Sequence, residues 1–309
     1  MKTLAGHLED YLKLRRQLGF KLEVAGRLLR SFVRFAKQQR AAFITTKLAL
    51  RWATQVPNIQ PVQKANRLGM ARRFAQYLSA IDPRTEVPAP KLLPYHCRRR
   101  EPHLYRVEDV RRLMEGARQI DPTHPIKGAS YATLIGLLAV TGMRAGEAIG
   151  LDREDTDLTE GILTIRHAKG GKTRLVPLHA STREALQRYA ALRDEVFPRP
   201  SCASFFVSER GTPLIYCSVN HWFLQVAWRI GLRKPGDRQG PRLHDLRHHF
   251  AIQTMLRWYR SKADVEAHLP DLSTYLGHVH VRDTYWYLSA VPELLQLATR
   301  RRQQMEAER

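Results

Sequence analysis

The chain has 309 residues, of which 43% are hydrophobic, and its 51 lysines and arginines against 29 acidic residues give a formal net charge of +22. This length allows two domains with separate cores, and the composition is typical of a globular protein rather than a disordered one. The longest apolar run is too short to span a membrane, no signal-peptide core is evident, and three scattered cysteines without CxxC spacing indicate neither a disulfide framework nor a zinc knuckle. We therefore expect a cytoplasmic protein.

The positive charge predicts a polyanionic partner, since basic surfaces attract polyanions and release the counterions of nucleic acids on binding. Arginine dominates the basic set, and its planar guanidinium is well suited to binding phosphate through two hydrogen bonds. No amphipathic helix carries a bulky apolar face set apart for lipid, so we expect no membrane partner. A basic surface that only aids solubility is the alternative, and nucleic acid is the favoured partner.

Residues 1–86 are predicted to form a bundle of helices, because apolar residues recur at helical spacing. Leu8 and Leu12 share one such stripe, Thr45 or Thr46 is a candidate N-cap, and the last helix follows Pro61. The basic side chains of that last helix are expected to point largely outward, where they could line DNA or serve only solubility. They are Lys64, Arg67, Arg72 and Arg73.

Residues 87–103 are predicted to be a linker, because their four prolines are incompatible with a helix interior. The linker has a basic end that could follow a phosphate backbone, although a passive spacer would look the same. The basic residues are Arg98, Arg99 and Arg100.

Residues 104–309 are predicted to be a second domain, mostly α-helical with a small antiparallel β-sheet. Strands over 161–166 and 173–178 flank a Lys-Gly-Gly-Lys turn, which predicts a β-hairpin with a lysine at its tip. The apolar run 205–207 is a candidate edge strand, and helices are expected over 245–256 and 292–302.

Arg144 follows a buried helix and a Thr-Gly break, so it is expected to begin a new helix beside packed core. A guanidinium there is costly to bury unless it holds an anion. Glu147, three residues on, lies on the same helical face and could orient it. A purely structural Arg–Glu pair is an equally good explanation of this motif alone.

His244 and Arg247 lie three residues apart after Gly-Pro, at a predicted helix N-terminus, where backbone N–H groups also favour an anion. The histidines that follow directly, at 248 and 249, are expected to be packing or surface residues. Further on, a Leu-Gly break presents His278, and two tyrosines, Tyr285 and Tyr287, compete for the role of nucleophile. Core packing is the commoner role for such tyrosines.

The ordered set of Arg-x-x-Glu, a lysine-tipped hairpin, His-x-x-Arg, Gly-His and tyrosine resembles the tyrosine recombinase family, the phage-integrase-like and Xer-like enzymes. The resemblance covers residues 104–290 and extends to the N-terminal bundle, which resembles the family's core-binding domain. It implies a two-domain DNA clamp. The implied catalytic residues are Arg144, Lys169, His244, Arg247, His278 and Tyr287, with Glu147 in support.

The resemblance favours Tyr287 over Tyr285 because Tyr287 lies nine residues after His278, and it favours Lys169 over Lys172. Lys172 and Arg174 of the hairpin are then candidate DNA contacts. The stretch from Arg247 to the second histidine is longer than usual, and it resembles recombinases carried by transposons and other mobile elements more than housekeeping Xer proteins.

The function implied is site-specific DNA recombination or integration through a 3′-phosphotyrosyl intermediate, without metal, cofactor or ATP. The expected partner is double-stranded DNA with specific recombination sites, bound by a monomer that assembles into a homotetramer on synapsed DNA. Accessory recombinases and association with the nucleoid are compatible with this function. The alternatives are DNA relaxation like that of type IB topoisomerases and a non-catalytic DNA-binding regulator.

Overall fold

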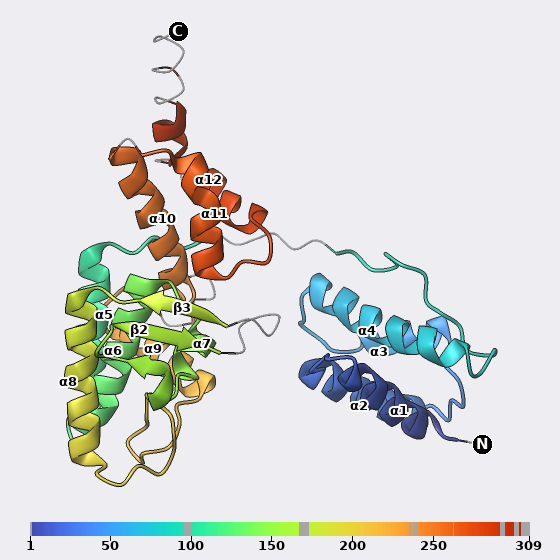
Figure 1. The fold of residues 1–309 in the computed structure, drawn as a ribbon. Helices are drawn as coiled ribbons and strands as arrows, with labels where there is room; N and C mark the ends of the chain where they lie inside the picture. Colours follow the sequence, from blue (N-terminus) through green and yellow to red (C-terminus); the bar gives the residue numbers. More distant parts are fainter. Residues whose placement is uncertain are drawn as a thin grey trace. The chain divides into compact units, whose positions relative to one another are not determined.

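A computed structural model describes residues 2–95, 101–166, 173–234, 236–237, 240–261, 263–290, 294–299 and 303. The chain divides into two compact units, residues 1–100 and 101–309 (Figure 1). The division falls within the predicted linker. Five of the predicted functional residues lie outside the described residues: Arg98, Arg99, Arg100, Lys169 and Lys172.

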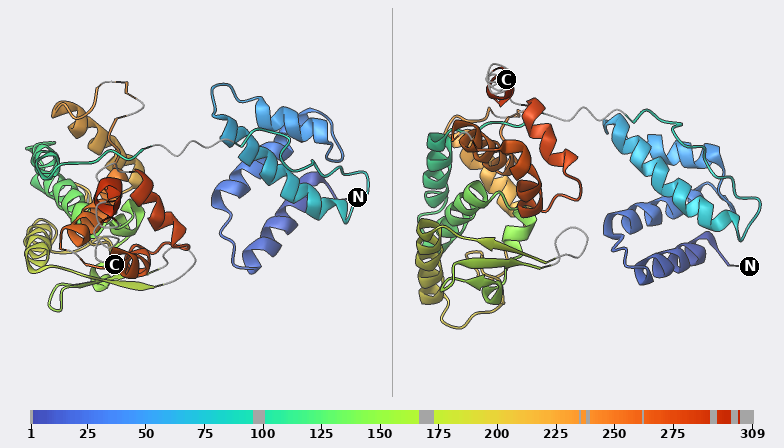
Figure 2. Two further views of the ribbon diagram at one scale, coloured as in Figure 1. Left: turned by 90° about the horizontal axis from the view of Figure 1, so that it is seen from above. Right: turned by 45° about the horizontal axis from the view of Figure 1, so that its top comes forward.

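The first unit is a helical bundle (Figure 2, blue to cyan), as its apolar periodicity predicts. Of the two predicted caps, Thr45 is the N-cap of the third helix, since its hydroxyl accepts a hydrogen bond from the Leu48 N–H at 3.1 Å. Leu12, Phe32 and Trp52 are fully buried in its core. The helices are α1 (Leu4–Gln17), α2 (Glu23–Gln38), α3 (Thr46–Thr54) and α4 (Pro61–Ser79).

Two of the arginines of α4 that were expected to point outward make hydrogen bonds within the first unit. Arg67 donates to the Trp52 carbonyl at 3.0 Å, its guanidinium lies 4.1 Å from the centre of the Trp52 ring, and burial lowers its pKa. Arg72 donates to the carbonyl of Pro88 at 2.9 Å. These contacts replace water with an aromatic face and with carbonyl oxygens. Of the predicted DNA contacts on α4, Arg73 has an exposed side chain and Lys64 is half-buried.

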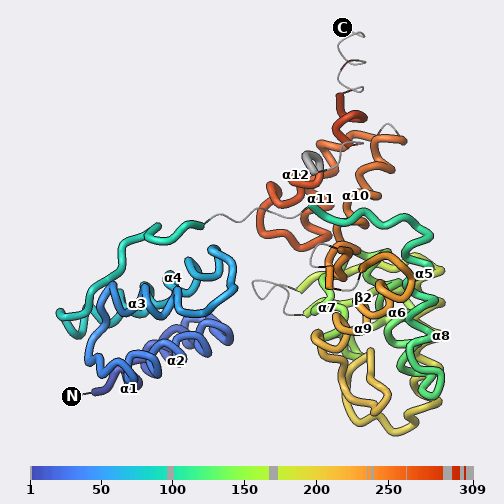
Figure 3. Tube along the Cα trace, turned by 180° about the vertical axis from the view of Figure 1, so that it is seen from behind, coloured from blue at the N-terminus to red at the C-terminus, as the bar shows by residue number. Residues whose placement is uncertain are grey.

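The second unit is mostly helical (Figure 3) with a small antiparallel sheet (Figure 1), as predicted. Helix α6 is buried along most of its length, so the other elements pack around it. The elements are α5 (Val107–Arg118), α6 (Pro125–Thr141), α7 (Ala145–Ile149), η1 (Arg153–Asp155), β1 (Thr156–Asp157), β2 (Ile162–Ile165), β3 (Arg174–Pro177), α8 (Ala180–Val196), α9 (Tyr216–Arg229), α10 (Asp245–Arg260), α11 (Val265–Leu276) and α12 (Arg282–Ala290).

The sheet has the strand order β1-β2-β3, and all its pairs are antiparallel. The predicted hairpin is formed by β2 and β3, which pair Ile165 with Arg174. The predicted edge strand at 205–207 is wrong, because Val207 makes only an isolated bridge outside the sheet. The backbone of Val207 makes hydrogen bonds with side chains instead of with a neighbouring strand. The Ser130 hydroxyl donates to the Val207 carbonyl at 2.7 Å, and the Val207 N–H donates to the Tyr189 hydroxyl at 3.1 Å.

Helices α10, α11 and α12 share a separate hydrophobic cluster that includes Met255, Leu269 and Tyr287. The residues described beyond α12 are helical over 294–299, and Leu294 is buried in the same cluster. Among the helices described, none combines the length and apolar character needed to cross a membrane.

Candidate active site

Two glycines in the left-handed conformation end the helices that lead into the site. Gly142, at φ 61°, caps α6, and Gly277, at φ 67°, caps α11. The carbonyl of Gly142 accepts a hydrogen bond from Nη1 of Arg247 at 2.8 Å, and the carbonyl of Gly277 accepts one from Nη2 of Arg144 at 2.7 Å. Helix C-termini attract cations, because their last carbonyls lack partners in the helix. The predicted arginines therefore lie at two helix ends brought together by the fold.

Glu147 links Arg144 to the sheet. As the sequence suggested, the Glu147 carboxylate accepts hydrogen bonds from Arg144. The donors are Nη1, at 2.7 Å, and the backbone nitrogen, at 3.0 Å. It also accepts from Nη2 and Nη1 of Arg174 at 2.7 and 3.1 Å. Burial alone would raise the pKa of Glu147, but the hydrogen bonds from both arginines outweigh burial and lower this pKa to about 2. Glu147 is thus a carboxylate at neutral pH.

Arg174 was expected to contact DNA, and its guanidinium instead binds Glu147 inside the site, with only 13% of the side chain exposed. It begins β3, where burial alternates, so it shares the inward face with the buried Val176. That alternation was a signal in the sequence that Arg174 points inward.

Arg247 is almost fully buried, at 3% exposure, and also donates to the Leu276 carbonyl at 2.6 Å. Burial, followed by the nearby charge of Arg144, lowers its pKa to about 10. Together, the guanidinium groups of Arg144, Arg174 and Arg247 and the carboxylate of Glu147 carry a net charge of +2. An anion entering here would meet an excess of positive charge.

The two predicted histidines belong to the same site. His244 is the N-cap of α10, and burial, then the charge of Arg247, lowers its pKa, which favours the neutral imidazole. His278 follows Gly277, and its Nδ1 lies 2.7 Å from the Thr284 hydroxyl. The His278 ring stacks against that of Tyr287, with centroids 6.3 Å apart.

Tyr287 is buried, at 1% exposure, whereas Tyr285 is 48% exposed. The Tyr287 ring lies among the rings of the site, while Tyr285 points towards solvent. The structure thus brings together five of the six predicted catalytic residues, and the sixth, Lys169, lies outside the described residues.

One residue of the site was missed by the sequence reasoning. His248 was expected to be a packing or surface residue, yet its Nδ1 lies 3.1 Å from the Tyr287 hydroxyl. Its ring also makes an edge contact with His244, at 4.7 Å between centroids. Residues four apart share a helical face, so the spacing from His244 to His248 was the available signal. His249 is a packing residue as expected, with its ring near Tyr105.

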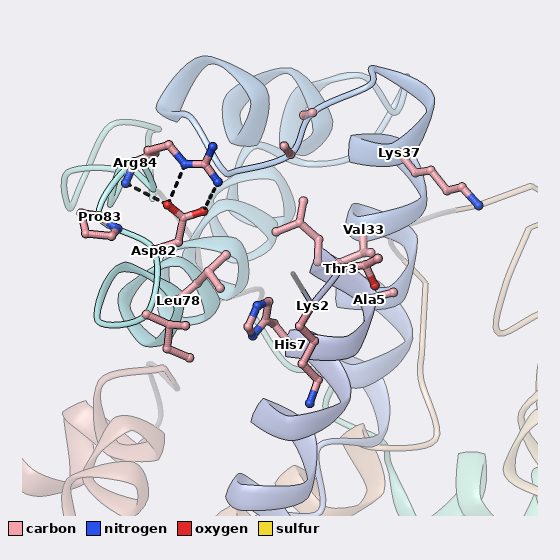
Figure 4. Close-up of a pocket in the computed structure, with 14 residues that line it drawn as sticks. Lys2, Thr3, Ala5, His7, Val33, Lys37, Leu78, Asp82, Pro83 and Arg84 are labelled. Carbon is pink, nitrogen blue, oxygen red and sulfur yellow. Dashed lines mark hydrogen bonds and ion pairs between the residues drawn. The ribbon is translucent and has the colours of Figure 1, made fainter.

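A cavity of about 880 Å³ lies elsewhere, in the first unit (Figure 4). It is lined by apolar side chains such as Val33 and Leu78 and by the Asp82–Arg84 ion pair, and its lining includes none of the candidate catalytic residues. Within the described ranges, no group of three histidine, cysteine or acidic side chains is arranged to hold a metal ion.

Comparisons with known proteins show the family of the chain. Residues 105–293 match the phage integrase family. The chain is 43% identical over 305 residues to the putative integrase/recombinase y4rB of Sinorhizobium fredii, which covers 97% of both chains. It is 30% identical over 223 residues to tyrosine recombinase XerC of Azotobacter vinelandii, covering 72% of this chain and 68% of the relative.

Solved structures share the fold at low identity. The site-specific recombinase XerH bound to palindromic difH substrate matches with a TM-score of 0.65 and 21% identity, over 94% of this chain and 83% of that one. The Tn1549 transposon integrase in complex with transposon right end DNA matches with a TM-score of 0.60 and 14% identity, over 93% and 94%.

Proposed function

The chain belongs to the phage integrase family of tyrosine recombinases, and from this membership we propose that it cuts and rejoins DNA at specific sites through Tyr287. The observation that best supports this chemistry is the meeting of four separate segments around one cationic site. These segments contribute Arg144, Arg247, His278 and the buried tyrosine. Both arginines are anchored on backbone carbonyls, so the site is preorganised before DNA arrives.

Arg144 and Arg247 bind the non-bridging oxygens of the scissile phosphodiester in this proposal, and His244 and His278 donate further hydrogen bonds. The pentacoordinate transition state carries more negative charge than the bound phosphate. A site with net positive charge therefore stabilises the transition state more than the ground state. Because the arginines supply this charge and the histidines add hydrogen bonds, the proposed reaction needs no metal ion.

The phenol oxygen of Tyr287 attacks phosphorus, the bond from phosphorus to the 5′ oxygen breaks, and Lys169 protonates the leaving oxygen. The product is a 3′-phosphotyrosyl enzyme and a free 5′-hydroxyl, which conserves the energy of the phosphodiester bond. A 5′-hydroxyl from a second duplex reverses the step, so strand exchange requires no ATP.

Exchange between two duplexes uses four active sites, so we propose a monomer that assembles into a tetramer on synapsed DNA. A structure of the lambda integrase tetramer bound to a Holliday junction shares the fold, with a TM-score of 0.60 and 17% identity. The exposed Arg73 of α4 is a candidate DNA contact of the first unit. A type IB topoisomerase activity would use the same chemistry on a single duplex, without exchange.

Covalent trapping tests the proposal. The purified protein is incubated with fragmented DNA of its source, denatured with detergent, and the DNA that stays attached is sequenced. Site-specific recombination predicts that the attached ends share a short sequence, and that two duplexes carrying it yield recombinant products. Covalent attachment without shared sequence or recombinants would support the topoisomerase alternative, and no attachment would support the non-catalytic regulator.

A further inference from the structure

The hydroxyl of Tyr287 lies beside a histidine that the proposed reaction has not yet used. His248 is on α10, directly after Arg247, and its Nδ1 is 3.1 Å from that hydroxyl. Both side chains are buried, at 6% exposure for His248 and 1% for Tyr287. The two residues are 39 positions apart, so this contact is made by the packing of α12 on α10.

A phenol has a pKa near 10, so Tyr287 must lose its proton as it attacks phosphorus at neutral pH. A general base must lie about 2.6–3.2 Å from the proton's heavy atom, and His248 meets this condition before DNA is bound. Imidazole is also suited to the task, because its ordinary pKa of about 6.5 leaves it mostly neutral at pH 7.

The other two histidines of the site have different recorded neighbours. His278 has its Nδ1 hydrogen-bonded to the Thr284 hydroxyl, and its ring lies nearly parallel to that of Tyr287, at an interplanar angle of 27°. The centres of the two rings are 6.3 Å apart. His244 touches the edge of the His248 ring, and the lowered pKa of His244 keeps it neutral. Arg247, the residue before His248 on α10, is the nearest charged residue in the sequence.

We propose that His248 is the catalytic base that accepts the phenol proton of Tyr287, an inference that rests on the function proposed above. With its own proton on Nε2, the imidazole presents the lone pair of Nδ1 to the hydroxyl. As the bond from the phenol oxygen to phosphorus forms, the proton moves to Nδ1, and the charged imidazolium lies beside a developing phosphotyrosyl group. In the rejoining step the same proton returns to the leaving phenolate.

The test compares His248→Asn with wild type on the DNA site recovered by trapping. Asparagine keeps a polar atom near the position of Nδ1, but it does not accept a proton at neutral pH. His249→Asn is the matched control, since His249 is also buried on α10 and its ring faces Tyr105 instead. The rate of covalent complex formation is measured from pH 5 to 9 on ordinary DNA and on DNA with a 5′-bridging sulfur at the cleaved bond.

We expect His248→Asn to slow covalent complex formation by about 10²–10⁴-fold, the usual contribution of a general base, while His249→Asn and DNA affinity change little. The loss should persist with the bridging sulfur, because a thiolate leaves without an acid and the defect lies in the nucleophile. The wild-type rate should fall as the pH drops through the pKa of the base. The variant's rate should still be rising at pH 9, since it depends on ionisation of the phenol itself.

A His248→Asn rate within threefold of wild type with the same pH profile would overturn the inference. A faster rate would also overturn it, because it would mean that His248 holds the tyrosine in an unreactive position. If the variant melts far below wild type, its slow rate could reflect misfolding, and the wild-type protein is used instead. A wild-type rate of covalent complex formation on the sulfur substrate that does not change from pH 5 to 8 would exclude a histidine base. Failure of wild type to form any covalent complex would instead refute the proposed function.

Discussion

Replacing Glu147 by glutamine removes the negative charge from the centre of the site while keeping the shape of the side chain. The Glu147 carboxylate accepts four hydrogen bonds, two from Arg144 and two from Arg174, and only 10% of the side chain is exposed. In the variant, the amide NH₂ must face one of the guanidinium groups. The cations of the site then repel one another with no carboxylate between them.

The size of the effect follows from the pKa of Glu147. A decrease from 4.5 to about 2 corresponds to about 3 kcal/mol of favourable interaction with the ionised form. Removing one partner of a buried ion pair costs about 3–5 kcal/mol, which agrees. Since the pKa is lower in the folded state, this stabilisation is complete above about pH 4.5 and is lost as the pH falls towards 2.

Urea unfolding followed by tryptophan fluorescence measures this difference. We expect Glu147→Gln to lower the free energy of unfolding by about 3 kcal/mol at pH 7, and by clearly less at pH 3.5. Glu108→Gln is the control, because Glu108 pairs with Arg111 at the same i, i+3 spacing but is 65% exposed. Exposed pairs contribute only about 0–1 kcal/mol. Equal effects of the two substitutions, or a Glu147 effect that does not change with pH, would refute the reasoning.

Three further predictions concern the same site. Arg247→Ala should slow DNA cleavage by about 10³-fold or more without abolishing DNA binding, measured by covalent complex formation, and cleavage at the wild-type rate would remove Arg247 from the site. Gly142→Ala should destabilise the protein by about 2–4 kcal/mol, since a Cβ there meets the Phe250 ring at 2.5 Å in a left-handed backbone, while Gly231→Ala, equally left-handed but open, should cost about 1 kcal/mol. EDTA should leave cleavage unchanged, and a requirement for added Mg²⁺ would contradict the proposed chemistry.

The sequence predicted those parts of the fold that depend on local patterns. The stripe that contains Leu8 and Leu12 and the threonine cap of α3 follow from periodicity and capping, and the hairpin follows from its turn residues. The run 205–207 has strand composition, but its backbone is bound by Ser130 and Tyr189, which lie far away in the sequence. No local pattern reports such partners.

The features of the site also divide into those that local patterns predict and those that depend on the tertiary structure. The predicted arginines and histidines follow helix breaks that are visible in the sequence, and the fold brings them together. The ion pair between Glu147 and Arg174 depends on β3 lying beside α7, which periodicity does not specify. His248 combines local and tertiary information. Its spacing from His244 places the two histidines on one helical face, which the sequence shows, whereas its contact with Tyr287 is seen only in the structure.

Whether Tyr287 is the nucleophile can be determined by locating the residue that becomes attached to DNA. Wild type, Tyr287→Phe and Tyr285→Phe are each incubated with nicked site DNA, and the covalent adduct is digested and mapped by mass spectrometry. We predict that the nucleotide mass lies on Tyr287, that Tyr285→Phe still forms the adduct, and that Tyr287→Phe binds DNA but forms none. An adduct on Tyr285, or one formed by Tyr287→Phe, would contradict the account.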